Sequence, residues 1–357
     1  MFSSLFDYRL PPECIAQSPV EPRDHSRMMT LDRHRKILQD EHFYDITRHT
    51  RPGDLLVWNN SRVFKARLSG FLLSPKGEIL REHKKPIEIF LVRPMENPGV
   101  WKVLAKPGRH VRPDSRIIFA EDFYCEVLLK EPEGSILVQF PYEEAEVRAK
   151  ANIYGQVPLP PYIKDEKHEL EVYQTCYSDK DKEGSVAAPT AGFHFTPSLI
   201  KKLKSQGVEF AEVTLHVGLG TFLPVKTERI EDHTMHGEWA ELTQVNADKI
   251  NKAKQEGRRV IAVGSTSTRT LEGIASLAGY ADKRFEVFNG DIDLFIKPGF
   301  QFKVVDALIS NFHLPKSTLL MLVAAFVGDR EYMLYSYQEA IHKGYRFYSF
   351  GDAMFIY

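Results

Sequence analysis

The chain has 357 residues, with 47 basic and 48 acidic side chains and 43% apolar residues, a composition typical of a globular protein with room for two domains. Its three cysteines are far apart and form no C-x-x-C motif, which argues against a disulfide framework or a zinc ribbon and fits a reducing cytosol. The opening residues lack the features of a signal peptide, and the longest apolar run, residues 319–327, is too short to span a bilayer. We therefore expect a cytoplasmic protein without a membrane segment.

The N-terminal part predicts a short helix over residues 45–51 and a buried strand over 54–60. Residues 62–147 then contain six short β-rich runs separated by turn residues, which predict a closed barrel or a sandwich. Charge is uneven here, because residues 51–116 hold 14 Lys and Arg against 6 Asp and Glu, whereas residues 117–183 hold 7 against 15. The pattern indicates either one basic binding face or ordinary solvated loops.

Helices and strands alternate in the last part of the chain. Thr196, followed by Pro197, and Thr243 are typical N-cap residues, and Gly207 and Gly257 end the helices that they begin. Further elements are expected as helices over 265–278, 317–327 and 331–343 and as strands over 208–217, 258–264 and 292–296.

This alternation predicts an α/β (mixed α+β) fold. The strand over 54–60 most simply joins the same sheet, so the β-rich segment is an insertion. The predicted division is a discontinuous α/β catalytic domain, residues 1–61 plus 150–357, and an inserted small all-β barrel domain, residues 62–149.

Two polar clusters contain glycine and histidine. Residues 187–195 read AAPTAGFHF and place His194 between two aromatic residues, either as a functional group or, more commonly, as a hydrogen-bonded histidine in a packed turn. Residues 216–222 begin with His216 and contain a G-x-G pair. No third glycine and no apolar helical period follow, so the pair by itself is weak evidence for a dinucleotide-binding or S-adenosylmethionine-binding turn.

A third cluster, GSTSTR at residues 264–269, lies between a buried strand and a helix start. Backbone N–H groups, hydroxyls and Arg269 there could bind an anion, or the residues could simply be a well-supplied N-cap. The fourth cluster contains His233 and His236, which could bind zinc, but Gly237 and the lack of an H-E-x-x-H pattern argue against a metal. Asn311 and His313 form one further polar pair before a buried helix.

Eleven stretches together resemble one known family. They include FDYRLP, NNSRVFKARL, AAPTAGFHF, VTLHVGLGTF, AVGSTSTRTLEG and SNFHLPKSTLLMLV, in order over nearly the whole chain. The family is the S-adenosylmethionine:tRNA ribosyltransferase-isomerases of queuosine biosynthesis. Departures are small: Ser265 and Thr268 replace threonine and valine, Lys297 replaces an aromatic residue, and Leu223 stands where arginine or glutamine is frequent.

The resemblance implies an activity and its partners. The enzyme would transfer and isomerise the ribosyl part of S-adenosylmethionine onto 7-aminomethyl-7-deazaguanine at the wobble position of tRNA. The products would be epoxyqueuosine in tRNA, adenine and methionine. The resemblance also implies a cytoplasmic enzyme that needs no metal or cofactor, since S-adenosylmethionine is consumed as a substrate. It implies an α/β domain with an inserted β-barrel, and a monomer is the default expectation.

The chemistry needs a base, and His194 is the first choice because imidazole titrates near neutral pH. His216 and His313 are rivals, and Asp7 or Asp306 could orient one of them. Arg269 would clamp the methionine carboxylate or a phosphate, and Gly218 and Gly220 would let the backbone approach the adenosyl group. These groups are expected to meet in one cleft. The predicted substrate-binding residues are Asp7, Tyr8, Arg9, Asn60, Arg62, Thr190, Gly192, Gly218, Gly220, Thr221, Ser265, Thr266, Ser267 and Asn311.

The wobble base must leave its loop to enter a pocket, as single-stranded RNA recognition generally requires. The candidates for contacting tRNA phosphates lie in the basic segment: Lys65, Arg67, Lys84, Lys85, Lys106, Arg109 and Arg112.

Three other functions fit parts of the sequence. An S-adenosylmethionine-dependent RNA methyltransferase would release S-adenosylhomocysteine. A non-catalytic RNA-binding barrel protein would consume no S-adenosylmethionine. A metal-dependent hydrolase using His233 and His236 would lose activity with a chelator.

Overall fold

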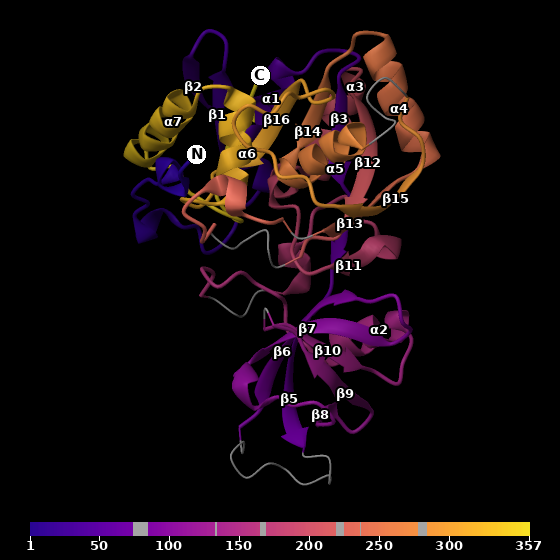
Figure 1. Ribbon diagram of the computed structural model, residues 1–357. Helices are drawn as coiled ribbons and strands as arrows, with labels where there is room; N and C mark the ends of the chain where they lie inside the picture. The colour runs from indigo at the N-terminus through magenta and orange to yellow at the C-terminus, as the bar shows by residue number, and fades with distance from the viewer. Residues whose placement is uncertain (74–84, 133, 165–168, 219–224, 236, 278–283) are drawn as a thin grey trace.

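The computed structural model describes residues 1–73, 85–132, 134–164, 169–218, 225–235, 237–277 and 284–357. It contains a nine-stranded sheet between layers of helices and, beyond it, a closed six-stranded barrel (Figure 1). The barrel strands lie in the chain between strands of the large sheet. This confirms the predicted fold class, an α/β domain with an inserted all-β barrel. The boundaries at residues 62 and 149 stay a prediction.

The large sheet has the strand order β15-β13-β12-β3-β14-β16-β17-β1-β2. Neighbours within the central group β12, β3, β14 and β16 are parallel, so their carboxyl ends meet at one edge. The strands are β1 Arg27–Asp32, β2 Ile37–His42, β3 Leu55–Asn59, β12 Glu209–Leu215, β13 Glu238–Leu242, β14 Val260–Val263, β15 Phe288–Ile292, β16 Ala307–Asn311 and β17 Ala353–Ile356.

Helices cover both faces of this sheet. Side chains alternate along β3, so Leu55 and Val57 share a core with α4, α5, α6 and α7, whereas Leu56 and Trp58 share one with α1 and α3. Burial on both faces explains why this strand is a continuous apolar run in the sequence. The helices are α1 Ile46–His49, α3 Pro197–Ser205, α4 Gln244–Gln255, α5 Gly264–Ser276, α6 Thr318–Val327 and α7 Arg330–His342.

Side-chain caps fix where several helices begin. The hydroxyl of Thr196 accepts the N–H of Leu199 (3.2 Å), which confirms the predicted cap of α3. Ser317 caps α6 in the same way through Leu320 (3.1 Å). Thr243 stands at the N-cap position of α4 without a capping bond to the backbone.

The predicted strand over 292–296 is wrong. β15 ends at Ile292, the residue that pairs with Glu238 at the beginning of β13. Because β13 begins at Glu238, residues 293–296 have no pairing partner in that strand. They continue outside the sheet, with Ile296 buried in the core.

The barrel is formed by β5 to β10, in the spatial order β10-β7-β6-β5-β8-β9. Val147 and Ala151 of α2 pack into its apolar core. A separate pair of short parallel strands, β4 and β11, lies outside the barrel. The bounds are β4 Arg62–Val63, β5 Arg67–Leu73, β6 Ile87–Pro94, β7 Val100–Lys106, β8 Arg116–Ala120, β9 Phe123–Lys130, β10 Ile136–Gln139, α2 Glu144–Tyr154 and β11 Glu183–Ser185.

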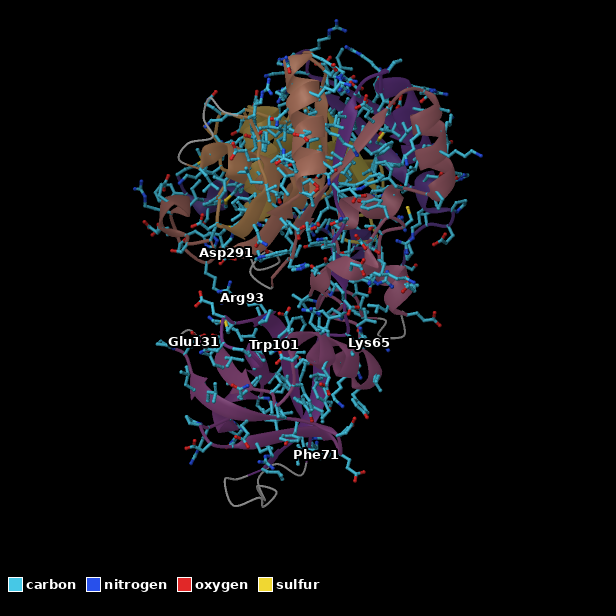
Figure 2. The ribbon with its side chains drawn as sticks, turned by 90° about the vertical axis from the view of Figure 1, so that its right-hand side faces the viewer. Lys65, Phe71, Arg93, Trp101, Glu131 and Asp291 are labelled. Carbon is cyan, nitrogen blue, oxygen red and sulfur yellow. The ribbon has the colours of Figure 1, made fainter. Side chains whose placement is uncertain are left out.

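Two chain segments connect the barrel to the larger domain. Arg67 and Gln156 exchange backbone hydrogen bonds of 3.3 and 2.8 Å where these segments run side by side. Gly155 lies so close that a Cβ would stand 2.3 Å from the carbonyl oxygen of Lys65. Arg93 of the barrel strand β6 also forms an ion pair of 3.3 Å with Asp291 of β15 in the larger domain (Figure 2). Within the described ranges, no helix has the length and apolar character needed to cross a membrane.

Candidate active site

A cleft opens at the carboxyl edge of the central parallel strands, the edge at which open α/β sheets bind ligands. It is lined by Val217 after β12, Gly264 and Ser265 after β14, and Asn311 at the end of β16. The space between these residues amounts to about 630 Å³, a figure that includes open solvent.

The N-terminus of α5 faces this cleft. Gly264 has a φ of +87°, which glycine adopts without strain, and it turns the chain from β14 directly into the helix. The first N–H groups of a helix have no intrahelical acceptor, and the helix dipole attracts an anion to them. Thr266 lines the cleft at 6% exposure, and its hydroxyl has no hydrogen-bond partner among the described residues. Together these groups can bind a carboxylate.

Asn311, in the lining of the cleft, forms a buried pair with His194, which lies behind it. Asn311 Nδ2 lies 3.2 Å from His194 Nε2 and 3.1 Å from the carbonyl oxygen of Tyr348. His194 Nδ1 lies 2.7 Å from the hydroxyl oxygen of Ser26. His194 is 3% exposed, and desolvation lowers its pKa to about 3, with nearby arginines acting in the same direction. The imidazole is therefore neutral and has a partner at each nitrogen.

His313 lies in the cleft itself, half-buried. Its Nε2 is 2.8 Å from the hydroxyl oxygen of Ser310. Its backbone is held on both sides, because Tyr8 donates its hydroxyl to the His313 carbonyl and the His313 N–H donates to the Tyr337 hydroxyl at 3.2 Å. Desolvation lowers the pKa of His313 to about 4, so the ring is neutral and can accept a proton at neutral pH.

Two stacked tyrosines form an apolar wall of the cleft. The rings of Tyr162 and Tyr348 lie 4.3 Å apart at 24°, and the hydroxyls of Tyr162 and Ser349 lie 2.7 Å apart. Tyr348 has a φ of +71°, a left-handed conformation that is rare for a bulky residue and costs ~1–3 kcal/mol. Such conformations cluster at functional sites.

Arg269 lies further along α5, at 2% exposure, in an ion pair with Glu238. Glu238 also accepts the N–H of Gly218 at 2.9 Å. Among the described residues that line the cleft, neither Arg269, Gly218 nor His194 occurs. The structure thus places these three around the cleft rather than in its surface, and the buried ion pair does not favour the predicted clamp of Arg269 on a substrate anion.

His216 lies away from the cleft. Its ring stacks on Trp239 at 5.0 Å, and Gly184 of β11 fits against it so closely that a Cβ there would stand 2.6 Å from Nε2. Desolvation, with Arg148 and Lys182 nearby, lowers its pKa to about 4. This packing between β12, β13 and β11 indicates a structural histidine.

The other predicted substrate-binding residues divide into two groups. Thr190, Ser265, Thr266 and Asn311 line the cleft. Near the N-terminus, Asp7 pairs with Lys316 (2.8 Å), Tyr8 donates to the His313 carbonyl, and Arg9 is exposed. Asn60 forms hydrogen bonds with Thr214 (2.7 Å) and Glu212 (3.2 Å), and Arg62 does so with Ser178 (3.1 Å) and Glu171. Gly192 packs on Tyr177, and Ser267 donates to the Val263 carbonyl (2.9 Å). Gly220 and Thr221 lie outside the described residues.

The predicted tRNA contacts are unevenly placed. Lys85, Lys106, Arg109 and Arg112 are exposed on the barrel. Arg67 instead donates to Glu88 (3.3 Å) and to the carbonyl of Leu159 (2.9 Å), so its guanidinium contacts other parts of this chain. Lys65 lies where the barrel meets the larger domain (Figure 2). Lys84 lies outside the described residues.

Several cleft residues were not predicted, namely Tyr162, Ser310, Ser317, Tyr348 and Ser349. Ser317 precedes an apolar helix and could have been found as its cap. The two tyrosines carry no local signal, since only the folded chain brings them together. Among the described residues, no cluster of three or more His, Cys, Asp or Glu side chains could hold a metal ion. His236 of the proposed zinc pair lies outside them.

The fold and the cleft are those of an α/β protein in which a helix terminus able to bind an anion and a neutral histidine lie at the carboxyl edge of the sheet. The family model described as "Queuosine biosynthesis protein" matches residues 3–356. Proteins named S-adenosylmethionine:tRNA ribosyltransferase-isomerase are 47% identical over 352 residues in Moorella thermoacetica, covering 98% of both chains, and 48% over 356 residues in Thermotoga maritima, covering 99% of both.

A solved structure agrees with these matches. The crystal structure of S-adenosylmethionine tRNA ribosyltransferase from Thermotoga maritima aligns with a TM-score of 0.56 and 38% identity, over 99% of this chain and 100% of that one. The chain belongs to the queuosine biosynthesis protein family and is a transferase.

Proposed function

We propose that this chain transfers and isomerises the ribosyl part of S-adenosylmethionine onto 7-aminomethyl-7-deazaguanine at the tRNA wobble position. The products are epoxyqueuosine in tRNA, adenine and methionine, so S-adenosylmethionine is a consumed substrate and not a cofactor. One observation carries the proposal beyond family membership. The cleft at the carboxyl edge combines an anion site at α5 with a neutral histidine at the end of β16, which are the two groups this reaction needs.

The methionine carboxylate binds at the N-terminus of α5 in this proposal. Ser265 and Thr266 bring backbone N–H groups to that point, together with the Thr266 hydroxyl, which has no hydrogen-bond partner within the described ranges. Arg269 acts indirectly, because its partner Glu238 holds the backbone of Gly218 next to the cleft residue Val217.

His313 takes the role of base in place of the first-choice His194. It lies in the cleft, whereas both nitrogens of His194 already have partners. A pKa near 4 keeps His313 neutral but makes it a weak base. The sulfonium supplies the missing driving force, because it acidifies hydrogens on the neighbouring 5′ carbon.

The chemistry then runs in three stages. His313 removes a 5′ proton, a C4′=C5′ double bond forms as the C4′–O4′ bond breaks, and the oxygen left on C1′ becomes an aldehyde as it expels adenine, which takes up a proton. The amine of the tRNA base adds to C4′ and loses a proton, and the sulfonium-stabilised carbanion that this leaves on C5′ attacks C1′ to close the five-carbon ring. The alkoxide on C1′ then displaces sulfur from C5′, which closes the epoxide and releases methionine. The stacked Tyr162 and Tyr348 offer an aromatic surface for one of the two bases.

Analysis of the small products tests this function. Purified protein is incubated with S-adenosylmethionine and tRNA carrying 7-aminomethyl-7-deazaguanine, and the products are separated chromatographically while the tRNA nucleosides are weighed by mass spectrometry. We expect adenine and methionine in equal amounts and epoxyqueuosine in the tRNA. S-adenosylhomocysteine without adenine would indicate a methyltransferase instead, and no consumption would indicate a binding protein.

Thr266→Val tests the carboxylate site within that assay. Valine keeps the shape of threonine and loses the hydroxyl, so the KM for S-adenosylmethionine should rise about tenfold with little change in kcat. An unchanged KM would move the carboxylate to another part of the cleft.

A further inference from the structure

Asn311 is the centre of a polar network that connects the cleft with a buried histidine. Its Nδ2 approaches two atoms, the Tyr348 carbonyl oxygen at 3.1 Å and His194 Nε2 at 3.2 Å. A carbonyl oxygen only accepts, so the group facing Tyr348 must be the NH₂. This fixes the orientation of the amide independently of the histidine.

The amide orientation in turn fixes the histidine tautomer. Since the NH₂ of Asn311 donates to it, Nε2 of His194 must be the unprotonated nitrogen. The ring proton then sits on Nδ1, 2.7 Å from the hydroxyl oxygen of Ser26. Both hydrogens of the Asn311 NH₂ are used, one by His194 and one by Tyr348.

The remaining atom of Asn311, Oδ1, is an acceptor with spare capacity. Its described partner is the hydroxyl of Thr190 at 3.4 Å, a long contact, and both Thr190 and Asn311 line the cleft. The left-handed backbone of Tyr348 also supports a fixed orientation of the Asn311 amide. Its N–H donates to the Phe312 carbonyl (3.1 Å) while its own carbonyl takes the Asn311 amide, so a strained turn helps to orient this one side chain.

We propose that His194 is a positioning residue that locks the amide of Asn311, and that Oδ1 of Asn311 accepts an N–H donor of the substrate in the cleft. The inference rests on the proposed function, because it takes S-adenosylmethionine as the molecule bound there. That molecule carries two such donors, the α-ammonium group of its methionine part and the 6-amino group of its adenine. His194 performs no proton transfer with substrate in this arrangement.

Two substitutions of His194 separate positioning from catalysis. His194→Gln keeps an acceptor that can face the Asn311 amide, whereas His194→Leu keeps bulk without an acceptor. We expect His194→Gln to retain kcat within about threefold of the unsubstituted enzyme and to leave the pH profile of kcat/KM unchanged. His194→Leu should lower kcat/KM for S-adenosylmethionine by about tenfold or more, mainly through KM. A loss of about 100-fold or more in kcat for both variants, with one limb of the pH profile removed, would make His194 the base and overturn the proposal.

Asn311→Ala, assayed with substrate analogues, gives a test that needs no change at His194. One analogue lacks the α-amino group, and the other carries two methyl groups on the 6-amino nitrogen. For the unsubstituted enzyme, the analogue without the recognised donor should lose about tenfold or more in kcat/KM relative to S-adenosylmethionine, and Asn311→Ala should abolish that difference. The analogue that shows the effect identifies which of the two donors is bound.

If both enzymes discriminate equally against each analogue, Asn311 does not contact a donor and the proposal fails. Failure of the proposed function is recognised separately, since the unsubstituted enzyme would then release no adenine or methionine from S-adenosylmethionine itself.

Discussion

Glu238 and Arg269 form an ion pair in which both side chains are nearly fully buried, at 5% and 3% exposure. The second carboxylate oxygen of Glu238 accepts the N–H of Gly218 at 2.9 Å. One carboxylate thus connects the helix α5, the strand β13 and the segment that leaves β12. All three elements border the carboxyl edge of the sheet, so the ion pair stabilises the elements that surround the cleft.

Glu238→Gln should lower the free energy of unfolding by about 3–5 kcal/mol, because it leaves the Arg269 guanidinium buried without a compensating charge. Denaturant unfolding followed by circular dichroism measures the loss. Glu241→Gln is the matched control, since the Glu241–Lys182 pair (2.8 Å) is more exposed and should contribute less than about 1 kcal/mol. Equal, small losses in both variants would contradict a structural role for Arg269.

Stability should fall as the pH is lowered from about 6.5 towards 4. His194, His216 and His313 have folded pKa values near 3, 4 and 4, below the ordinary value of 6.5, so the unfolded chain binds protons in this range that the folded chain does not. The stability that their neutral forms provide is complete above pH 6.5 and is lost as the pH falls through the folded values. Each histidine contributes a slope of at most about 1.4 kcal/mol per pH unit.

Denaturant unfolding at pH 7, 6 and 5 tests this dependence. His216→Phe, which preserves a ring against Trp239, should make the slope shallower by up to about 1.4 kcal/mol per pH unit. Replacement of the exposed His34 by Gln should leave it unchanged. A slope that responds equally to both substitutions would show that the three desolvated histidines are not its source.

The sequence was most informative where local chemistry determines structure. The cap at Thr196, the apolar run of β3 and the six β-rich runs of the barrel are encoded within a few residues each, and all are present as predicted. The strand over 292–296 was misplaced because its true end depends on where its partner β13 begins, which is long-range information.

The candidate site shows the same limit. Thr190, Thr266, Asn311 and His313 were recognisable as polar residues at element ends, and they meet in the cleft. Arg269 looked equally functional, but its partner Glu238 is 31 residues away in the sequence and nothing local indicates the pairing. The contribution of Tyr348 comes from its left-handed backbone, which no local sequence rule predicts for a tyrosine.

Gly192 and Gly218 should respond differently to alanine. A Cβ on Gly192 would stand 1.9 Å from the Tyr177 hydroxyl, so Gly192→Ala should lower the melting temperature and cost about 1–3 kcal/mol. Tyr177→Phe in that background should recover part of the loss. Among the described residues, a Cβ on Gly218 would meet Glu238 alone, at 3.9 Å, so Gly218→Ala should stay within about 1 kcal/mol. If Gly218→Ala nevertheless raises the KM for S-adenosylmethionine, the close approach of the substrate to this glycine is supported; an unchanged KM would contradict it.

Neutralising the basic loop of the barrel should reduce the salt dependence of tRNA binding. Lys106, Arg109 and Arg112 are exposed, and their loop leads into Arg116, which pairs with Leu73 near the end of the barrel that Phe71 marks in Figure 2. If each cation contacts a phosphate, replacing all three by alanine should make the slope of log affinity against log salt shallower by about 2–3.

A matched triple variant of Arg48, Lys201 and Lys202, exposed on α1 and α3, should leave the slope unchanged. Filter binding between 50 and 200 mM salt measures both. Equal slopes for the two variants would place the tRNA on another surface.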